Sequence, residues 1–415
     1  MITSKSIVSR RSVVFAGAAA ALVHTLPRLS LAADKAGDSS DIVKSVEHSI
    51  VWRAGEKGAT WFHPRPCLVP GQRPTVLMTL QPISGSDVYG HVHWSQSINA
   101  GTTWSDPAPI PGLGRKPPAD GLEEGVCDVV PGYHAKTETI LAIGHNVFYK
   151  NNKLATPQPP RHPVYSVRDT VGDWSVPKVL KWDDPRGSAI YTCGCGQRVS
   201  LENGDILIPF SFGPKDRVDR SVAAFRCSFD GKDVSIKEIG NELRRPVKRG
   251  LLEPSMTLLD GRYYMTIRAE DDRGYVTQSN DGLHWPEPQP WCWDDGTPLT
   301  MSTTQQHWLT HSDALYLVYT RMAETNAKVF RWRAPLFIAL VDRSTMRLVR
   351  QTERVVLPII GDPLKAPAQV ARMGNFHVVN VSPDESLVTD VELSPQNYTG
   401  DLMLARIRWA RPNRL

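Results

Sequence analysis

The sequence lacks a block of like charge and a long hydrophobic run, and helical periodicity is scarce. Charged residues make up 22% of its 415 residues and are interspersed with 12 Trp, 11 Tyr and 10 Phe. A chain of this composition can bury a large core, which excludes wholesale disorder. The apolar run from Val13 to Val23 has 11 residues, too few to span about 30 Å of hydrocarbon. A membrane-spanning helix is therefore not expected there.

Cysteine is also scarce, and its spacing does not favour a metal. The six residues include Cys193 and Cys195, which form a CxC pair and not the CxxC pairs of zinc sites. No histidine cluster lies at ligand spacing nearby. We expect structural or partly bridged cysteines, no metal and no cofactor.

The formal charge of +5 comes almost entirely from the N-terminus. The first 33 residues contain Lys5, Arg10, Arg11 and Arg28 and no acid, which leaves 44 Lys+Arg against 43 acids beyond them. The paired arginines, the apolar stretch and the small residues near position 33 resemble a bacterial twin-arginine signal peptide. The resemblance implies a periplasmic or secreted protein. A nearly neutral exported chain is not expected to bind nucleic acid, nor a membrane once the signal is removed.

Short segments rich in Val, Ile, Leu, Tyr and Phe recur beyond the predicted signal. They are separated by the Gly, Pro, Asp and Asn residues that favour turns, which predicts strands. The clearest lie at 74–80, 90–97, 138–149, 204–212, 261–269, 314–321, 335–342 and 402–409. No domain boundary is visible after residue 40 or so. We predict a signal peptide at 1–33, a linker at 34–45 and one all-β domain at 46–415.

A repeat runs through the predicted strands. SINAGTTW at 97–104 and SNDGLHW at 279–285 share Ser, Asn or Asp, Gly and Trp in the same order, and weaker copies occur at 166–174, 228–233 and 341–345. The markers Asn99, Asp169, Asp230, Asp281 and Asp342 are 51 to 70 residues apart, room for one four-stranded unit each. An Asn or Asp side chain can accept backbone N–H groups in a tight turn, while Gly supplies positive φ and Trp packs beneath.

The two strong copies resemble the Asp boxes, or BNR repeats, of the sialidase (neuraminidase) superfamily. The resemblance implies a six-bladed β-propeller of four-stranded antiparallel blades. Asp boxes are structural in that family and lie away from its active face.

The segment 251–285 also resembles that family, in which a Glu-Pro strand and an Arg-ending strand precede an Asp box. The resemblance implies that Glu253 partners a catalytic nucleophile and that Arg268 belongs to an arginine triad gripping a carboxylate. Bidentate guanidinium binding and activation by a carboxylate suit these roles.

Other family features have altered counterparts. The family's Arg-x-Pro motif corresponds to FHPRPCLV at 62–69, where either His63 or Arg65 faces the site, or both do through a bulge. In blade six, Arg372 is expected to complete the triad and His377 to occupy the reactive position. The family's nucleophilic Tyr has no convincing match, since Tyr398 lies too near the closing strand.

The family's acid/base is an Asp on a loop after the first blade. The corresponding stretch at 123–134 offers Glu123, Glu124 and Asp128, of which Asp128 is the expected acid. A basic and aromatic segment at 318–342 contributes Arg321, with Arg331 and Arg333, which suits gripping of an anionic sugar.

Together these features predict an exo-acting glycoside hydrolase that cleaves a terminal sugar, expected to be acidic, from an extracellular glycan. Glu253, Asp128, His63 and His377 are the candidate catalytic residues, and Arg65, Arg268, Arg372 and Arg321 the candidate substrate-binding residues. Two alternatives stay open: a His-based polysaccharide lyase or other exo-glycosidase, and a non-catalytic sugar-binding propeller. The identity of the sugar and the oligomeric state are not predicted.

Overall fold

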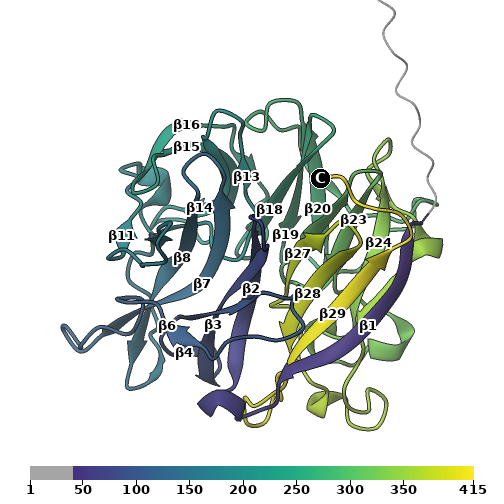
Figure 1. Cartoon of the computed structure of the whole chain (residues 1–415), viewed down its shortest axis with the longest axis horizontal. Coiled ribbons are helices and arrows are strands. Elements are labelled where there is room, and N and C mark those ends of the chain that lie inside the picture. Colours follow the sequence, from purple (N-terminus) through teal and green to yellow (C-terminus); the bar gives the residue numbers. More distant parts are fainter. Residues whose placement is uncertain (1–40) are drawn as a thin grey trace, which may run out of the picture. The chain divides into compact units, whose positions relative to one another are not determined.

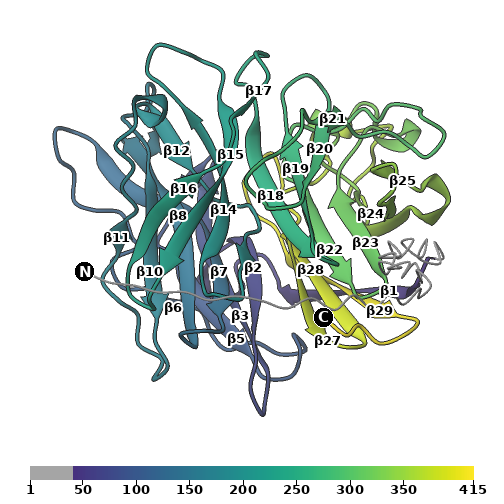
Figure 2. The same cartoon turned by 90° about the horizontal axis from the view of Figure 1, so that it is seen from above.

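The computed structural model describes residues 41–415, which form a six-bladed β-propeller of antiparallel blades. Figure 1 shows the strands of this domain and Figure 2 shows them from above. The predicted signal at 1–33 lies outside the described residues. Within the described part, no helix is long and apolar enough to cross a membrane.

Each blade is a sheet whose first strand is innermost. The first blade contains β2 (Trp61–Val69), β3 (Thr75–Gly85) with the hairpin strand β4 (Val88–Tyr89), β5 (His93–Ser97) and β6 (Ala108–Pro109). The second contains β7 (Glu123–His134), β8 (Thr139–Lys150) with β9 (Lys153–Leu154), β10 (Pro163–Arg168) and β11 (Lys178–Val179). The third contains β12 (Ile190–Thr192), β13 (Val199–Ser200), β14 (Ile206–Gly213), β15 (Ser221–Phe229), β16 (Val234–Ile239) and β17 (Leu243–Arg244).

The remaining blades follow the same plan. The fourth contains β18 (Leu252–Leu259), β19 (Arg262–Arg268), β20 (Gly274–Ser279) and β21 (Gln289–Pro290). The fifth contains β22 (His307–His311), β23 (Ala314–Tyr319), β24 (Leu336–Asp342), β25 (Arg347–Leu348) and β26 (Arg354–Leu357). The sixth contains β27 (His377–Ser382), β28 (Glu385–Val391), β29 (Leu402–Trp409) and β1 (Val43–Trp52). Short 3-10 helices span Glu56–Gly58, Pro185–Gly187, Glu324–Asn326, Phe330–Trp332, Arg350–Thr352 and Pro367–Gln369.

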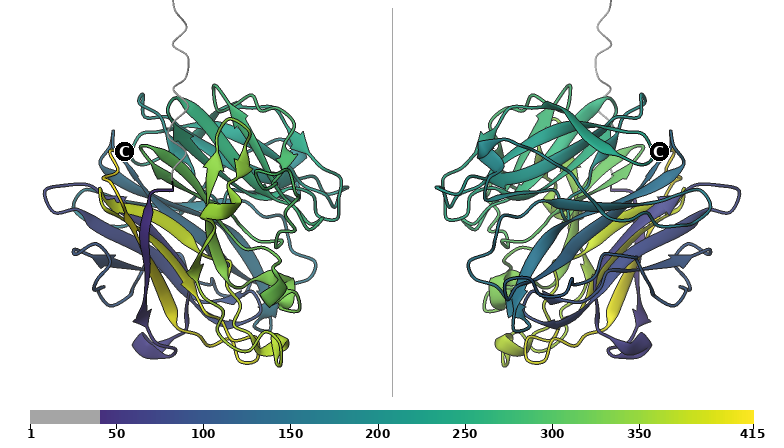
Figure 3. Two further views of the ribbon diagram at one scale, coloured as in Figure 1. Left: turned by 90° about the vertical axis from the view of Figure 1, so that its right-hand side faces the viewer. Right: turned by 90° about the vertical axis from the view of Figure 1, so that its left-hand side faces the viewer.

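The ring is closed by the two ends of the domain. The N-terminal strand β1 pairs antiparallel with β29, and the purple and yellow strands lie side by side in Figures 1 and 3. Ile42 is buried, and Asp41 forms an ion pair with Arg354 of the fifth blade. The predicted linker 34–45 therefore overlaps the closing strand. The predicted boundary at 46 is wrong because residues 41–45 already belong to the propeller.

The core lies between neighbouring blades. Along β14, Ile206 and Ile208 join a cluster with the second blade, whereas Leu207 joins a cluster with the fourth. Both faces of β14 are thus covered by neighbouring blades, and a strand that is buried on both faces is almost wholly apolar. All eight predicted strand segments coincide with observed strands.

The turns singled out by their repeat make the hydrogen bonds that their sequence predicts. Asn99 Oδ1 accepts the Thr103 N–H at 2.9 Å, and Asp281 Oδ1 accepts the N–H groups of Leu283 and His284 at 2.9 and 2.8 Å. The Trp285 indole donates to the Gly282 carbonyl. These turns follow the third strands β5 and β20, at the end away from the pocket described next.

Candidate active site

A cavity of about 290 Å³, here called the central pocket, lies where the innermost strands of the blades converge. Backbone bulges shape it. His63 on β2, Asp128 on β7 and Glu253 on β18 all line the pocket and have positive φ angles of 53°, 55° and 46°. The pairing register shifts beside each of them. A bulge re-aims a side chain and is common next to functional sites, so three blades direct a polar side chain into one space.

The pocket is strongly cationic. Seven arginines and only three carboxylates line it; the arginines are Arg161, Arg220, Arg249, Arg268, Arg331, Arg333 and Arg372. Arg249 and Arg268 form ion pairs with Glu270 and Glu253. The other five make no ion pair with any residue that the structure describes. Charged groups are seldom buried without a partner, so this excess of positive charge favours an anionic ligand.

Three of these arginines occupy equivalent places in different blades. Arg161, Arg220 and Arg333 each precede the third strand of a blade by one to three residues. In each case the arginine carbonyl accepts an N–H from the blade that follows, from Tyr191, Leu251 and Met373 respectively. The same backbone contact therefore presents a guanidinium to the central pocket three times.

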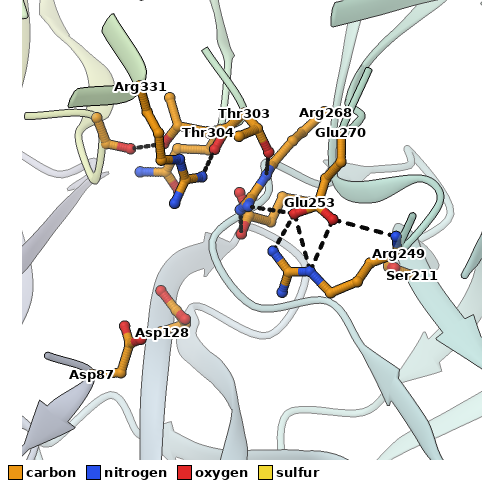
Figure 4. A network of polar contacts seen from close by, with 12 residues as sticks. Asp87, Asp128, Ser211, Arg249, Glu253, Arg268, Glu270, Thr303, Thr304 and Arg331 are labelled. Carbon is orange, nitrogen blue, oxygen red and sulfur yellow. Dashed lines mark hydrogen bonds and ion pairs between the residues drawn. The ribbon is translucent and has the colours of Figure 1, made fainter. Parts of the chain in front are cut away.

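Figure 4 shows the network around Glu253. Its carboxylate pairs with Arg268, which also donates from Nε to Thr303 Oγ1 at 2.9 Å. Arg331 donates to the Thr303 carbonyl beside them. Burial raises the pKa of Glu253, but Arg268 outweighs that effect and the pKa is lowered. Glu253 is thus an ionised carboxylate whose side chain is 31% exposed.

Asp128 is held by a second network. Arg65 Nη2 lies 2.5 Å and His63 Nε2 3.4 Å from Asp128 Oδ1. Burial opposes ionisation of Asp128, but His63, Arg65 and His145 hold its pKa well below the usual range. A carboxyl in this state cannot donate a proton near neutral pH, which argues against the predicted acid role. The stretch expected as a loop is also the strand β7, and its Glu124 pairs with Lys116.

His63 and His145 line the pocket as neutral imidazoles. Burial lowers the pKa of His63 to about 4, with Asp128 opposing the shift. Burial and then Arg161 lower the pKa of His145 well below its usual value. Both rings are thus available as proton acceptors at neutral pH.

Asp87 is a pocket carboxylate that the sequence analysis missed. It follows β3 in an exposed hairpin, has a φ angle of 55°, and accepts a hydrogen bond of 2.8 Å from the Tyr89 hydroxyl. Asp87 makes no ion pair with the described residues. Figure 4 places Asp87 and Asp128 apart from the Glu253 network. The only sequence signal for this residue was an Asp directly after Gly85 and Ser86, in the turn that joins β3 to β4.

Several predicted residues do not line the pocket. Arg65 is fully buried, where it contacts Asp128 and Gln305. His377 is also buried and packs edge-on against His307, with ring centroids 4.7 Å apart. Arg321 forms an ion pair with Glu353 and packs over Phe337. The structure therefore does not bring Arg65, Arg321 or His377 into the pocket wall, and the roles expected of them stay predictions without support from this geometry.

The remaining predicted residues do reach the pocket. Arg268 and Arg372 line it, and Arg372 packs over the Phe330 ring at 4.3 Å. In the blade-six stretch where the resemblance implies a Tyr, the pocket residues are Arg372 and Asn375. Tyr398 also lines the pocket, although its position near β29 argued against it. Tyr398 and Tyr89 make no hydrogen bond to Glu253 among the described contacts, so no Tyr–Glu pair is formed.

One side-chain triplet has the spacing of metal ligands. Cys127 Sγ lies 3.4 Å from His145 Nε2 and 3.9 Å from Asp128 Oδ2, which is itself 3.9 Å from His145 Nε2. Burial and Asp128 raise the pKa of the Cys127 thiol well above its usual value, so binding would require loss of its proton. The surrounding guanidiniums further disfavour a cation. The absence of a metal stays a prediction, and all six cysteines are unbridged.

The comparisons with known proteins agree on the fold. No protein-family model and no curated protein matches the chain. A Dyadobacter fermentans protein of unknown function has a TM-score of 0.61 at 14% identity, over 88% of this chain and 100% of its own. Trypanosoma rangeli sialidase has a TM-score of 0.60 at 14% identity, over 87% of this chain and 59% of its own. A Hadza microbial sialidase has a TM-score of 0.62 at 14% identity, over 87% and 68%. The chain thus has a sialidase-like propeller fold.

Proposed function

We propose that the protein is an exo-acting glycoside hydrolase that removes a terminal acidic sugar from an extracellular glycan. The observation that carries the proposal is the group of pocket arginines that have no carboxylate partner. These arginines line the same pocket as the ionised Glu253. The two sialidases compared above share the fold at only 14% sequence identity. The shared fold supports a glycosidase, but it does not identify the sugar. The twin-arginine pattern supports export to the periplasm or beyond.

In the proposed mechanism, Arg331, Arg333 and Arg372 bind the anionic group of the sugar. Planar guanidiniums bind carboxylates bidentately, which fixes the orientation of the ring. Asp87 is exposed and, unlike Asp128, has no ion-pair partner among the described residues, so it can take a proton from solvent and pass it to the glycosidic oxygen as the bond to the anomeric carbon breaks. Glu253 accepts a proton from the attacking water. Asp128, held ionised by Arg65, stabilises the positive charge that develops on the sugar ring.

The test is hydrolysis of a panel of fluorogenic glycosides of acidic sugars, each with a neutral analogue. We expect release from an acidic glycoside, and a kcat about 10²- to 10⁴-fold lower in Asp87→Asn and Glu253→Gln, the range for loss of a general acid or base. Glu238→Gln, on the exposed strand β16, is the matched control. Unchanged turnover in both pocket variants would remove the site assignment. Binding without product would instead favour a sugar-binding propeller.

A second candidate function is favoured by His63. Its neutral ring lies 3.4 Å from Asp128, and the pocket arginines can neutralise a uronate carboxylate. A lyase needs both features, because the base removes the proton next to the carboxylate and the C4–O bond breaks. Ultraviolet absorbance from an unsaturated uronate, lost in His63→Asn, would establish the lyase. Asn is the suitable replacement because it tolerates the positive φ at this position.

A further inference from the structure

Two arginines on the second and third blades stand apart from those assigned to the sugar's anionic group. Arg161 precedes β10 and Arg220 precedes β15, and both line the central pocket. Arg161 donates only from Nε, to the Asn146 carbonyl at 3.1 Å. Among the described residues, Arg220 has no side-chain hydrogen bond. The terminal nitrogens of both guanidiniums are therefore available to a ligand.

The two guanidiniums line the same pocket and interact electrostatically. Burial, followed by the positive charges of Arg161 and Arg249, lowers the pKa of Arg220 to about 10. Arg161 and Arg220 also lower the pKa of His145, which lines the same pocket. Two like charges in a partly enclosed space repel each other, and an anion placed between them would relieve that repulsion.

The carboxylates of the protein do not supply that anion. Asp128 is already bound by Arg65, Glu253 by Arg268, and Glu270 by Arg249. Asp87, the remaining pocket carboxylate, makes no ion pair with any arginine that the structure describes. A carboxylate offers about four acceptor sites, which three guanidiniums fill when one binds bidentately and two bind through single hydrogen bonds. Five arginines without a partner therefore exceed what one anionic group can satisfy.

We infer that Arg161 and Arg220 form a second anion subsite, which binds a second carboxylate or sulfate ester of the same glycan. The inference rests on the proposed function for the glycan, whereas the subsite itself follows from the two unpaired guanidiniums. The substrate class is then an acidic glycan with at least two anionic groups. Arg331, Arg333 and Arg372 hold one group, and Arg161 and Arg220 hold the other.

The test uses inorganic sulfate as the probe, at constant ionic strength. Equilibrium dialysis with radiolabelled sulfate counts the saturable sites on the full chain, and an anomalous map from a selenate-soaked crystal locates them. We expect two sites in the wild type and one in Arg161→Met/Arg220→Met, with affinity at the lost site reduced at least tenfold. Arg186→Met/Arg217→Met is the matched control, because it removes two arginines of the third blade that are ion-paired to Asp184 and Glu242.

Each outcome separates the subsite from the proposed function. Two sites retained in Arg161→Met/Arg220→Met, or no sulfate bound by the wild type, would overturn the subsite. A site that is lost in this variant but survives in Arg331→Met/Arg333→Met supports it. Failure of every acidic glycoside to be hydrolysed would remove the proposed function and leave the sulfate count unaffected.

Discussion

Replacement of Arg331 by Met is expected to make the protein more stable and to weaken its anion binding. Arg331 is partly buried in the pocket wall, and its only described polar contact is the Thr303 carbonyl. Burial, followed by Arg333 and Arg268, lowers its pKa from the usual range of arginine to about 9. The folded protein thus holds this charge at a cost in free energy.

The magnitude follows from that pKa. The lowering to about 9 corresponds to about 5 kcal/mol before screening, at about 1.36 kcal/mol per pH unit. Solvent in the open pocket screens the charge, and the lost hydrogen bond offsets about 1 kcal/mol, so we expect a net gain of about 1–2 kcal/mol. For a chain of this size, the melting temperature should rise by about 1–3 °C.

The assay is chemical and thermal denaturation, with and without sulfate. We expect Arg331→Met to bind sulfate at least tenfold more weakly, since a hydrogen bond to a charged group contributes about 1.5–3 kcal/mol. Arg331→Lys keeps the charge and should show no gain in stability. Arg350→Met, an exposed arginine paired with Asp295, should change stability by less than about 0.5 kcal/mol. A variant that is less stable and binds sulfate normally would refute the assignment of Arg331 as an uncompensated cation.

Three further predictions concern stability. Asp281→Ala removes an acceptor of two turn N–H groups and should lower the free energy of unfolding by about 1 kcal/mol in urea, whereas Asp281→Asn should recover most of it; no loss would contradict the turn's role. Arg65→Met leaves Asp128 without its guanidinium and should cost about 3–5 kcal/mol, measured as a fall in melting temperature that Arg65→Met/Asp128→Asn partly reverses. The pKa of His63 is about 4 in the folded protein and 6.5 in the unfolded chain. The unfolded chain therefore binds a proton at a higher pH than the folded protein does, so the stability that the neutral His63 maintains is complete above pH 6.5 and is lost as the pH falls to 4. Urea denaturation at pH 7 and 4.5 should show up to about 3 kcal/mol of this dependence, and it should be smaller in His63→Asn; equal dependence in both proteins would count against a buried neutral His63.

Much of the fold could be predicted because its signals are local. The turns at Asn99 and Asp281 are closed by side chains within four residues, so their sequence alone specifies the hydrogen bonds. The resemblance of the segment 251–285 to a family motif points to Glu253 and Arg268, and the structure pairs them across adjacent strands. The structure places both in the pocket, while their chemical roles stay predictions.

The orientation of other candidates could not be read from the sequence. Whether His63 or Arg65 faces the pocket depends on a bulge at positive φ, which places His63 in the wall and Arg65 beneath Asp128. The same uncertainty applied to His377, which faces His307 in the buried interior. A shift of one residue reverses the face of a strand, and no sequence pattern specified that shift.

The sequence by itself determined the strands, the turns and the repeat period, because these are properties of neighbouring residues, and the resemblance of its turns to Asp boxes implied the propeller. It also located the surplus positive charge in the N-terminal 33 residues and left the rest of the chain nearly neutral. Only the tertiary structure decided where the arginines meet. Arg161, Arg220, Arg331, Arg333 and Arg372 are far apart in the chain, and the closure of the blades into a ring brings them to one pocket. Convergence of this kind depends on long-range packing, so a nearly neutral chain can contain a strongly cationic site.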